Sequence, residues 1–163
     1  MKHALAALVL LAATSVLGAP GGLQRLGDGT LRWFGFRVYD ATLWAAERSA
    51  EFSAPLRLEL RYARALSGAA IAERSQEEIA RLGFGTPEQR SRWLEAMRRL
   101  FPDVIAGDTL AGEHQPGRGA RFSRNGAPLG EIADPEFSRA FFSIWLDPRT
   151  SAPALRAQLL GRP

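Results

Sequence analysis

The chain has 163 residues, with 21 basic against 17 acidic side chains, a net charge of +4 and no cysteine. Without cysteine there can be no disulfides, metal–thiolate sites or cysteine nucleophiles, and His3 and His114 are too few for a multi-histidine metal site. Lys2 is the only lysine, and the arginines are scattered rather than gathered in a stripe, so nucleic-acid binding is not indicated.

The beginning of the chain has the pattern of a secretory signal peptide. A short basic head precedes the apolar residues 4–13, and small residues follow at 14–19. The apolar run is too short to span a bilayer as a helix, although a retained N-terminal anchor is the alternative. We predict a cleaved signal peptide at 1–19, a periplasmic location, and one domain at 20–163 without stable membrane insertion. The sequence does not indicate an oligomeric state.

The run 27–44, GDGTLRWFGFRVYDATLW, is the most informative segment of the chain. Its Gly-x-Gly start is not followed by a helix, which predicts a turn and not a phosphate-binding loop. The rest predicts a long strand of aromatic and β-branched residues with unusually many polar side chains. Strand periodicity places Arg37 and Tyr39 on one face and Arg32 on the other, unless Gly35 is a bulge that resets the register.

The remaining elements follow from apolar periodicity and from capping residues. Residues 56–63, LRLELRYA, alternate strictly, as in a half-buried antiparallel strand. The other predicted elements are helices at 68–82 and 87–101, strands at 109–114, 120–124 and 127–132, a helix that begins at 135, and a last helix at 151–160. This order indicates an α+β fold, with an antiparallel sheet and helices stacked on one of its faces.

Most reactive side chains have a simple structural explanation. Glu77 and Glu78 lie beside arginines on the polar side of a predicted helix, so we interpret them as helix-surface ion pairs. His114 is interpreted as an exposed surface histidine, and Asp134 as a helix cap. Ser67 and Ser75 have no adjacent base. We therefore predict no catalytic residue, no metal site and no cofactor.

Arginine and tyrosine in the run 27–44 leave two interpretations open. An arginine fork with a tyrosine hydroxyl in an apolar wall is what a carboxylate with an apolar tail requires. The alternative is an arginine at the rim of the sheet that pairs with Asp28 or Asp40. Composition alone favours the rim ion pair.

A series of short segments covers nearly all of the chain after the predicted signal peptide. The segments are GDGTLRWFGFRVYDATLW at 27–44, LSG at 66–68, IAERS at 71–75, FPDV at 101–104, GD at 107–108, NG at 125–126, LGEIADPEF at 129–137 and FFSIWL at 141–146. In this order they resemble the bacterial chalcone isomerase-like proteins. The resemblance implies an open-faced β-sandwich, in which helices overlay a long antiparallel sheet and a cleft lies between them.

The same resemblance argues against the plant enzyme's cyclisation chemistry. The threonine, tyrosine and asparagine of that active site fall here on Tyr39, on Ile71 and near Glu78, and only the arginine has a match, Arg32. Tyr39 instead resembles the non-catalytic, fatty-acid-binding branch of the fold. In that branch an arginine and a tyrosine hold the carboxylate, which implies the same role for Arg32 and Tyr39.

The leading hypothesis is therefore an exported, non-enzymatic binder of a fatty acid or a similar small amphipathic carboxylate. Arg32 and Tyr39 are the expected head-group contacts, with Arg37, Tyr62 and Arg64 as secondary candidates. One alternative is an isomerase or intramolecular lyase that acts on a phenolic or enone substrate. The other is a periplasmic module that docks a peptide or a partner helix.

Overall fold

The computed structural model describes residues 20–48 and 50–162, so the predicted signal peptide lies outside the described residues. After a short 3₁₀ helix, η1 (Pro20–Gly22), the strands are β1 (Gln24–Trp33), β2 (Phe36–Ala45), β3 (Leu56–Tyr62), β4 (Thr109–Gln115), β5 (Gly119–Arg124) and β6 (Ala127–Ile132). The helices are α1 (Gly68–Leu82), α2 (Pro87–Leu100), α3 (Pro135–Leu146) and α4 (Pro153–Leu159). None of these helices is both long enough and apolar enough to cross a membrane.

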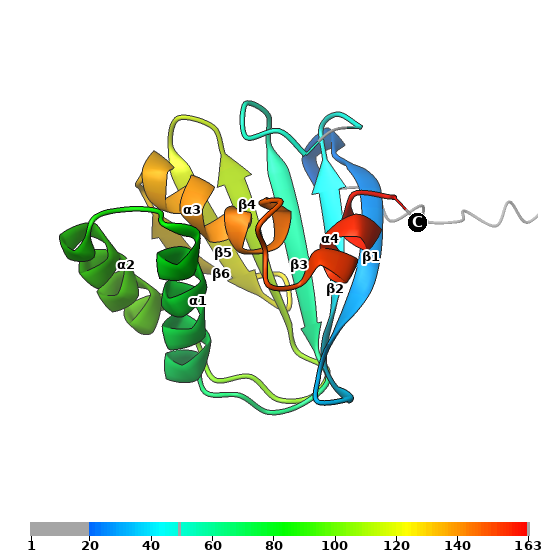
Figure 1. The fold of residues 1–163 in the computed structure, drawn as a ribbon, viewed down its shortest axis with the longest axis horizontal. Helices are drawn as coiled ribbons and strands as arrows, with labels where there is room; N and C mark the ends of the chain where they lie inside the picture. Colours follow the sequence, from blue (N-terminus) through cyan, green and yellow to red (C-terminus); the bar gives the residue numbers. More distant parts are fainter. Residues whose placement is uncertain (1–19, 49, 163) are drawn as a thin grey trace, which may run out of the picture.

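The six strands form one antiparallel sheet in chain order, from β1 at one edge to β6 at the other (Figure 1). Helices α3 and α4 pack directly on the sheet, α1 packs on α3, and α2 packs on α1 and β6. The predicted α+β architecture, an open antiparallel sheet overlaid by helices, is confirmed. The sheet can stay open because only one of its faces is apolar.

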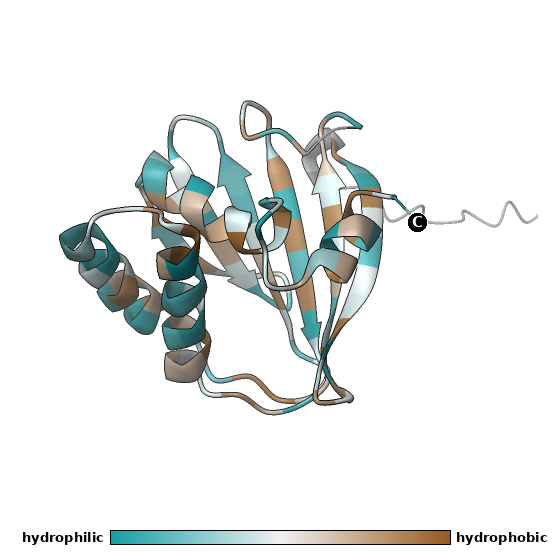
Figure 2. Cartoon of the chain, viewed as in Figure 1, coloured by the Kyte–Doolittle hydropathy of each residue, from teal (hydrophilic) through white to brown (hydrophobic). Residues whose placement is uncertain are grey.

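Strand β3 shows how the sequence produces this two-faced sheet. Leu56, Leu58 and Leu60 are buried under the helices, while the residues between them point to the other face. There Arg57 pairs with Glu59 at 2.8 Å and with Glu113 of β4 at 2.5 Å. The alternation is visible in Figure 2 as brown and teal bands along β3.

The helices begin where capping residues satisfy their first backbone N–H groups. Thr86 and Gln89 form a capping box around Pro87, as the sequence predicts. Asp134 caps α3 by accepting from the backbone N–H groups of Glu136 and Phe137, and it also accepts from the indole Nε1 of Trp93, at 2.8 Å. The prediction of Asp134 as a helix cap is therefore confirmed.

The run 27–44 is a hairpin, and the prediction of one long strand is wrong. Trp33 pairs with Phe36, and the two residues between them form the turn. Phe34 has a φ of +49° and Gly35 a φ of +80°, and two positive φ angles are what a type I′ turn requires. Phenylalanine is an unusual residue for this conformation, so the turn gave no signal in the sequence.

The Gly-x-Gly turn predicted at the start of this run is also wrong, because Gly27 and Gly29 lie inside β1. A Cβ on Gly27 would lie 2.1 Å from the carbonyl oxygen of Gln158, and one on Gly29 would lie 2.1 Å from the Gln158 Oε1. Helix α4 therefore approaches β1 so closely that a side chain at position 27 would meet the α4 backbone, while one at position 29 would have to displace the side chains of Gln158 and Leu155.

His114 is buried, and its interpretation as an exposed surface histidine is wrong. One ring nitrogen lies 2.7 Å from the Ser138 Oγ of α3, and the other lies 2.8 Å from the carbonyl oxygen of Phe52. Burial lowers the pKa of His114 below its ordinary value, which favours the neutral ring. His114 thus ties the sheet, a helix and the loop before β3 together.

Candidate functional site

A cavity of about 620 Å³ lies between the buried face of the sheet and helices α1 and α3. Its walls are mostly apolar, and they include Leu58, Leu60, Phe122, Phe141 and Ile144. Helix α1 forms the wall opposite the sheet. Ser151 and Ala152, in the chain before α4, close part of the rim. The volume lies within the range of roughly 300–1,000 Å³ that is typical of sites for small molecules.

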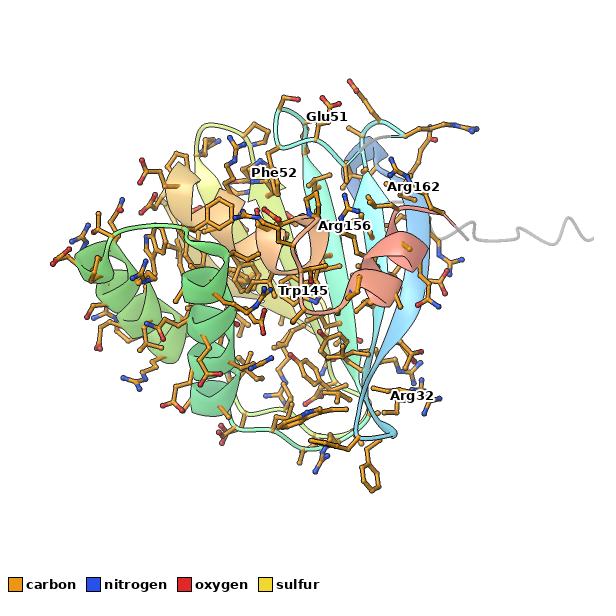
Figure 3. All side chains as sticks on the ribbon, viewed as in Figure 1. Arg32, Glu51, Phe52, Trp145, Arg156 and Arg162 are labelled. Carbon is orange, nitrogen blue, oxygen red and sulfur yellow. The ribbon has the colours of Figure 1, made fainter. Side chains whose placement is uncertain are left out.

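Two tyrosines and a tryptophan contribute polar groups to the cavity from the strands and from α3. Tyr39 and Tyr62 face each other across β2 and β3, with their rings 5.6 Å apart in an edge-to-face arrangement. Trp145, labelled near the centre of the molecule in Figure 3, donates from Nε1 to the Tyr39 hydroxyl at 2.9 Å. The Tyr39 oxygen acts as the acceptor, so its own proton is free to be donated into the cavity.

Both tyrosines are neutral hydrogen-bond donors in this environment. Burial raises the pKa of Tyr39 to about 12, opposed in part by the hydrogen bond from Trp145. Burial raises the pKa of Tyr62 as well, and the neighbouring Tyr39 adds to the shift. Within the described part of the chain the Tyr62 hydroxyl has no hydrogen-bond partner. Neither phenol is placed to act as a base at neutral pH.

The α1 wall of the cavity carries charges that neutralise one another. Glu78 accepts from Arg74 at 2.6 Å and from Arg81 at 3.0 Å, which confirms the predicted ion pairs. Its side chain is only 6% exposed, however, so Glu78 is a buried cavity residue and not a surface one. Glu77 pairs with Arg74, and Glu73 pairs with Arg98 of α2. Every acidic side chain of this wall therefore has a basic partner.

Arg32 lies at the opening of the cavity, which β1 borders on one side and α1 on the other. The lining residues that are exposed mark this opening, and they include Arg32, Trp33, Glu73 and Arg74. Figure 3 shows Arg32 near the end of the β1–β2 hairpin, away from Trp145. Its Nη1 donates only to the carbonyl oxygen of Gly35 at 3.3 Å, and it forms no ion pair with any residue that the structure describes.

A bulge interrupts the pairing of β1 with β2. Leu31 pairs with Tyr39 but Arg32 pairs with Arg37, so Val38 is an extra residue on β2. The anticipated position of the bulge, Gly35, is therefore wrong, because Gly35 belongs to the turn and the bulge lies at Val38. Arg32 and Tyr39 both line the cavity, although the register pairs Arg32 with Arg37 and pairs Tyr39 with Leu31, the neighbour of Arg32 on β1.

The predicted contact residues separate into two groups. Arg32, Tyr39 and Tyr62 line the cavity, while Arg37 and Arg64 do not. Arg37 forms a two-pronged ion pair with Asp40, with its Nε 3.0 Å from the Asp40 Oδ1. The rim ion pair considered from composition thus describes Arg37 and not Arg32. Arg64 is exposed in the loop after β3.

The described residues contain no group of three or more histidine, cysteine, aspartate or glutamate side chains that could hold a metal ion. The Ser75 hydroxyl donates to the carbonyl oxygen of Ile71, and Ile71 offers no hydroxyl at the position of the enzyme's tyrosine. Ser138 and His114 are hydrogen-bonded but fully packed in the core, outside the cavity.

Comparison with known proteins agrees with this arrangement of sheet, helices and cavity. The sequence model described as chalcone isomerase-like matches residues 14–161. The chain belongs to the chalcone isomerase-like family. No curated protein matches the chain.

Among solved structures, the chalcone isomerase-like chain is similar to a fatty-acid binding protein from Arabidopsis thaliana. The TM-score is 0.69 at 13% sequence identity, over 87% of this chain and 88% of the other. At this identity the similarity shows the fold and not the ligand. Tyr39, Ile71 and Glu78, on or near which the sequence resemblance places the plant enzyme's threonine, tyrosine and asparagine, all line the cavity.

Trp145 and Glu78 are cavity residues that sequence reasoning did not assign to the site. Glu78 could have been recognised, since it continues the predicted apolar stripe of Ile71 and Ser75 at helical spacing. A charged residue on a buried stripe indicates a partner or a polar cavity. Trp145 gave no such signal, because a tryptophan on an apolar helix face is ordinary core.

Proposed function

We propose that this protein binds a fatty acid or a similar small amphipathic carboxylate in the cavity between the sheet and helices α1 and α3. One observation carries the proposal. Among the charged side chains that line the cavity, Arg32 alone has no oppositely charged partner within the described residues. An apolar cavity with one uncompensated cation at its opening suits an anion with an apolar tail.

The charged, polar and apolar side chains of the cavity suggest how each part of such a ligand would be held. Arg37, the partner of Arg32 in the hairpin register, is already paired with Asp40, so Arg32 is the cation that remains to bind an anion. We propose that Arg32 binds the carboxylate and that the neutral hydroxyls of Tyr39 and Tyr62 donate to it or to its nearest polar group. The apolar side chains of the sheet and of α3 would then enclose the tail.

The same residues support binding rather than isomerisation. A cyclising enzyme needs a positioned general acid or base near its substrate. The cavity offers Ile71 where the plant enzyme has its tyrosine, and its two phenols have raised pKa values. No observation favours a docked peptide or helix, so we retain the small ligand as the proposed function.

The role of Arg32 is tested by comparing two arginine substitutions in one hairpin. We expect Arg32→Gln to weaken the binding of a fluorescent fatty acid by about tenfold to a hundredfold, because a charge-assisted hydrogen bond is lost. Arg37→Gln is the matched control, since Arg37 is held by Asp40 outside the cavity. Equal affinities for the wild type and Arg32→Gln would contradict the proposed head-group contact.

We also propose that the protein is exported to the periplasm, which the basic head and the apolar residues 4–13 support. Protein recovered from the periplasm would then begin at Ala19 or Pro20, because the small-residue exit permits cleavage after Gly18 or Ala19. Mass spectrometry of the intact chain measures this directly. A chain that keeps Met1 and stays in the cytoplasm would contradict export.

A further inference from the structure

The large exposed apolar side chains of the described residues gather at one end of the molecule. Trp33, Phe34 and Phe36 at the hairpin are 68%, 86% and 69% exposed, and Ile105 is 62% exposed. Ile105 lies in the loop before β4, next to Val104, which forms a bridge with Leu66 in the segment after β3. We call these four residues the apolar tip. Figure 1 shows the β1–β2 turn and this loop at the same, lower end.

Phe34 occupies the tip against its own backbone preference. The β1–β2 turn has φ angles of +49° and +80°, and the β5–β6 turn has +49° and +83° at Asn125 and Gly126. The two turns therefore have matching geometry, but only the second uses the preferred Asn-Gly pair. A bulky residue with positive φ is costly, and at 86% exposure Phe34 recovers little of that cost within the described chain. A contact outside the chain would recover it.

The surroundings of the apolar tip are basic. Arg32 is next to Trp33, and Arg64 lies one residue after Ala63, whose N–H donates to the carbonyl oxygen of Val38 in the hairpin. Arg32 and Arg64 are exposed and form no ion pair with the residues that the structure describes. Nearby carboxylates are already engaged, since Asp40 pairs with Arg37, and Asp108 pairs with Arg124.

We propose that the apolar tip docks on a lipid bilayer with anionic head groups. Aromatic rings with flanking arginines are the side chains that insert at a membrane interface and contact its phosphates. The tip is a narrow, convex turn, which enters a bilayer surface more readily than it covers a flat protein face. A few rings and two arginines give reversible binding and not a stable anchor.

The docked orientation brings the cavity to the bilayer. Trp33 belongs to the tip and also lines the cavity, and Arg32 beside it lies at the cavity opening. An amphipathic carboxylate could therefore pass between the bilayer and the cavity without crossing open water. This second step rests on the proposed function, whereas docking itself does not.

A hairpin variant can remove two of the four side chains of the apolar tip without weakening the fold. Phe34→Asn creates the Asn-Gly pair that this turn geometry prefers, and Phe36→Thr keeps a good strand residue. Neither phenylalanine lines the cavity. We expect the double variant F34N/F36T to keep its fatty-acid affinity within about twofold, because the cavity is untouched.

The test measures co-sedimentation of the protein with vesicles of phosphatidylcholine alone or mixed with phosphatidylglycerol. We expect the wild type to bind the anionic vesicles and F34N/F36T to bind at least about tenfold more weakly, because two inserted rings are lost. Arg64→Gln should weaken binding to the anionic vesicles only. Added salt should weaken it as well.

Three results would overturn the docking proposal. They are a wild type that ignores anionic vesicles, a double variant that binds them equally well, or a wild-type dimer that becomes a monomer in the double variant. The last result would show a second copy of the chain on the tip. Vesicle binding without any fatty-acid binding would contradict the proposed function while leaving docking intact, so the two failures are distinguishable.

Discussion

Tyr39 and Tyr62 are the only tyrosines of the chain, and both line the cavity. Their ionisation therefore reports on the site without any labelling. Because burial raises the pKa of Tyr39 to about 12 and raises that of Tyr62 too, the folded protein should show no tyrosinate absorbance at pH 10. In urea, both should titrate near the ordinary value of 10.0.

The raised pKa values of Tyr39 and Tyr62 make the free energy of unfolding depend on pH. The folded state holds these two protons more tightly than the unfolded state, so their contribution to the free energy of unfolding is complete below pH 10. The contribution of Tyr39 is lost as the pH rises from about 10 toward 12. Ultraviolet titration measures the ionisation. A tyrosine that ionises near pH 10 in the folded protein would contradict its burial beside Trp145.

Helix α4 on strand β1 offers the sharpest prediction at the scale of elements. Gly29→Ala should lower the free energy of unfolding by about 1–3 kcal/mol, because the new Cβ meets the Gln158 side chain and Leu155. Gln158→Ala should recover part of that loss. It should recover nothing for Gly27→Ala, where the new Cβ meets the carbonyl oxygens of Gln158 and Leu159.

Urea unfolding of these single and double variants gives the coupling energies. Equal rescue at both glycines would contradict the packing of α4 on β1. This contact also explains why the sequence predicts a turn at Gly27 and Gly29 where the structure has a strand. Two glycines in sequence indicate freedom of the backbone, while their close approach to a helix more than a hundred residues later leaves no local trace.

Elements with a local cause could be predicted from the sequence. The capping box at Thr86, the cap at Asp134, the Asn125-Gly126 turn and the alternation of β3 are all encoded within a few residues. The β1–β2 turn could not be predicted, because Phe34 is a poor turn residue whose position has to be explained by something other than local preference.

At the scale of the whole molecule, the cavity exists because the two layers touch only in part. Helix α3 packs on β4 and β5, and α4 packs on β1 and β2, while α1 packs on α3 and covers the space between. The sequence predicted the two layers and three of the lining residues, Arg32, Tyr39 and Tyr62. It could not separate Arg32 from Arg37, since the ion pair of Arg37 with Asp40 and the position of Arg32 at the cavity follow from the folded hairpin and not from composition.

The central claim is that an amphipathic carboxylate occupies this cavity, and native mass spectrometry with added oleic acid tests it most directly. We expect one fatty acid per wild-type chain and per Arg37→Gln chain. Ile71→Trp places a large side chain inside the cavity, so this variant should bind none. A wild type that takes up no fatty acid, or an Ile71→Trp chain that takes up as much as the wild type, would contradict the claim.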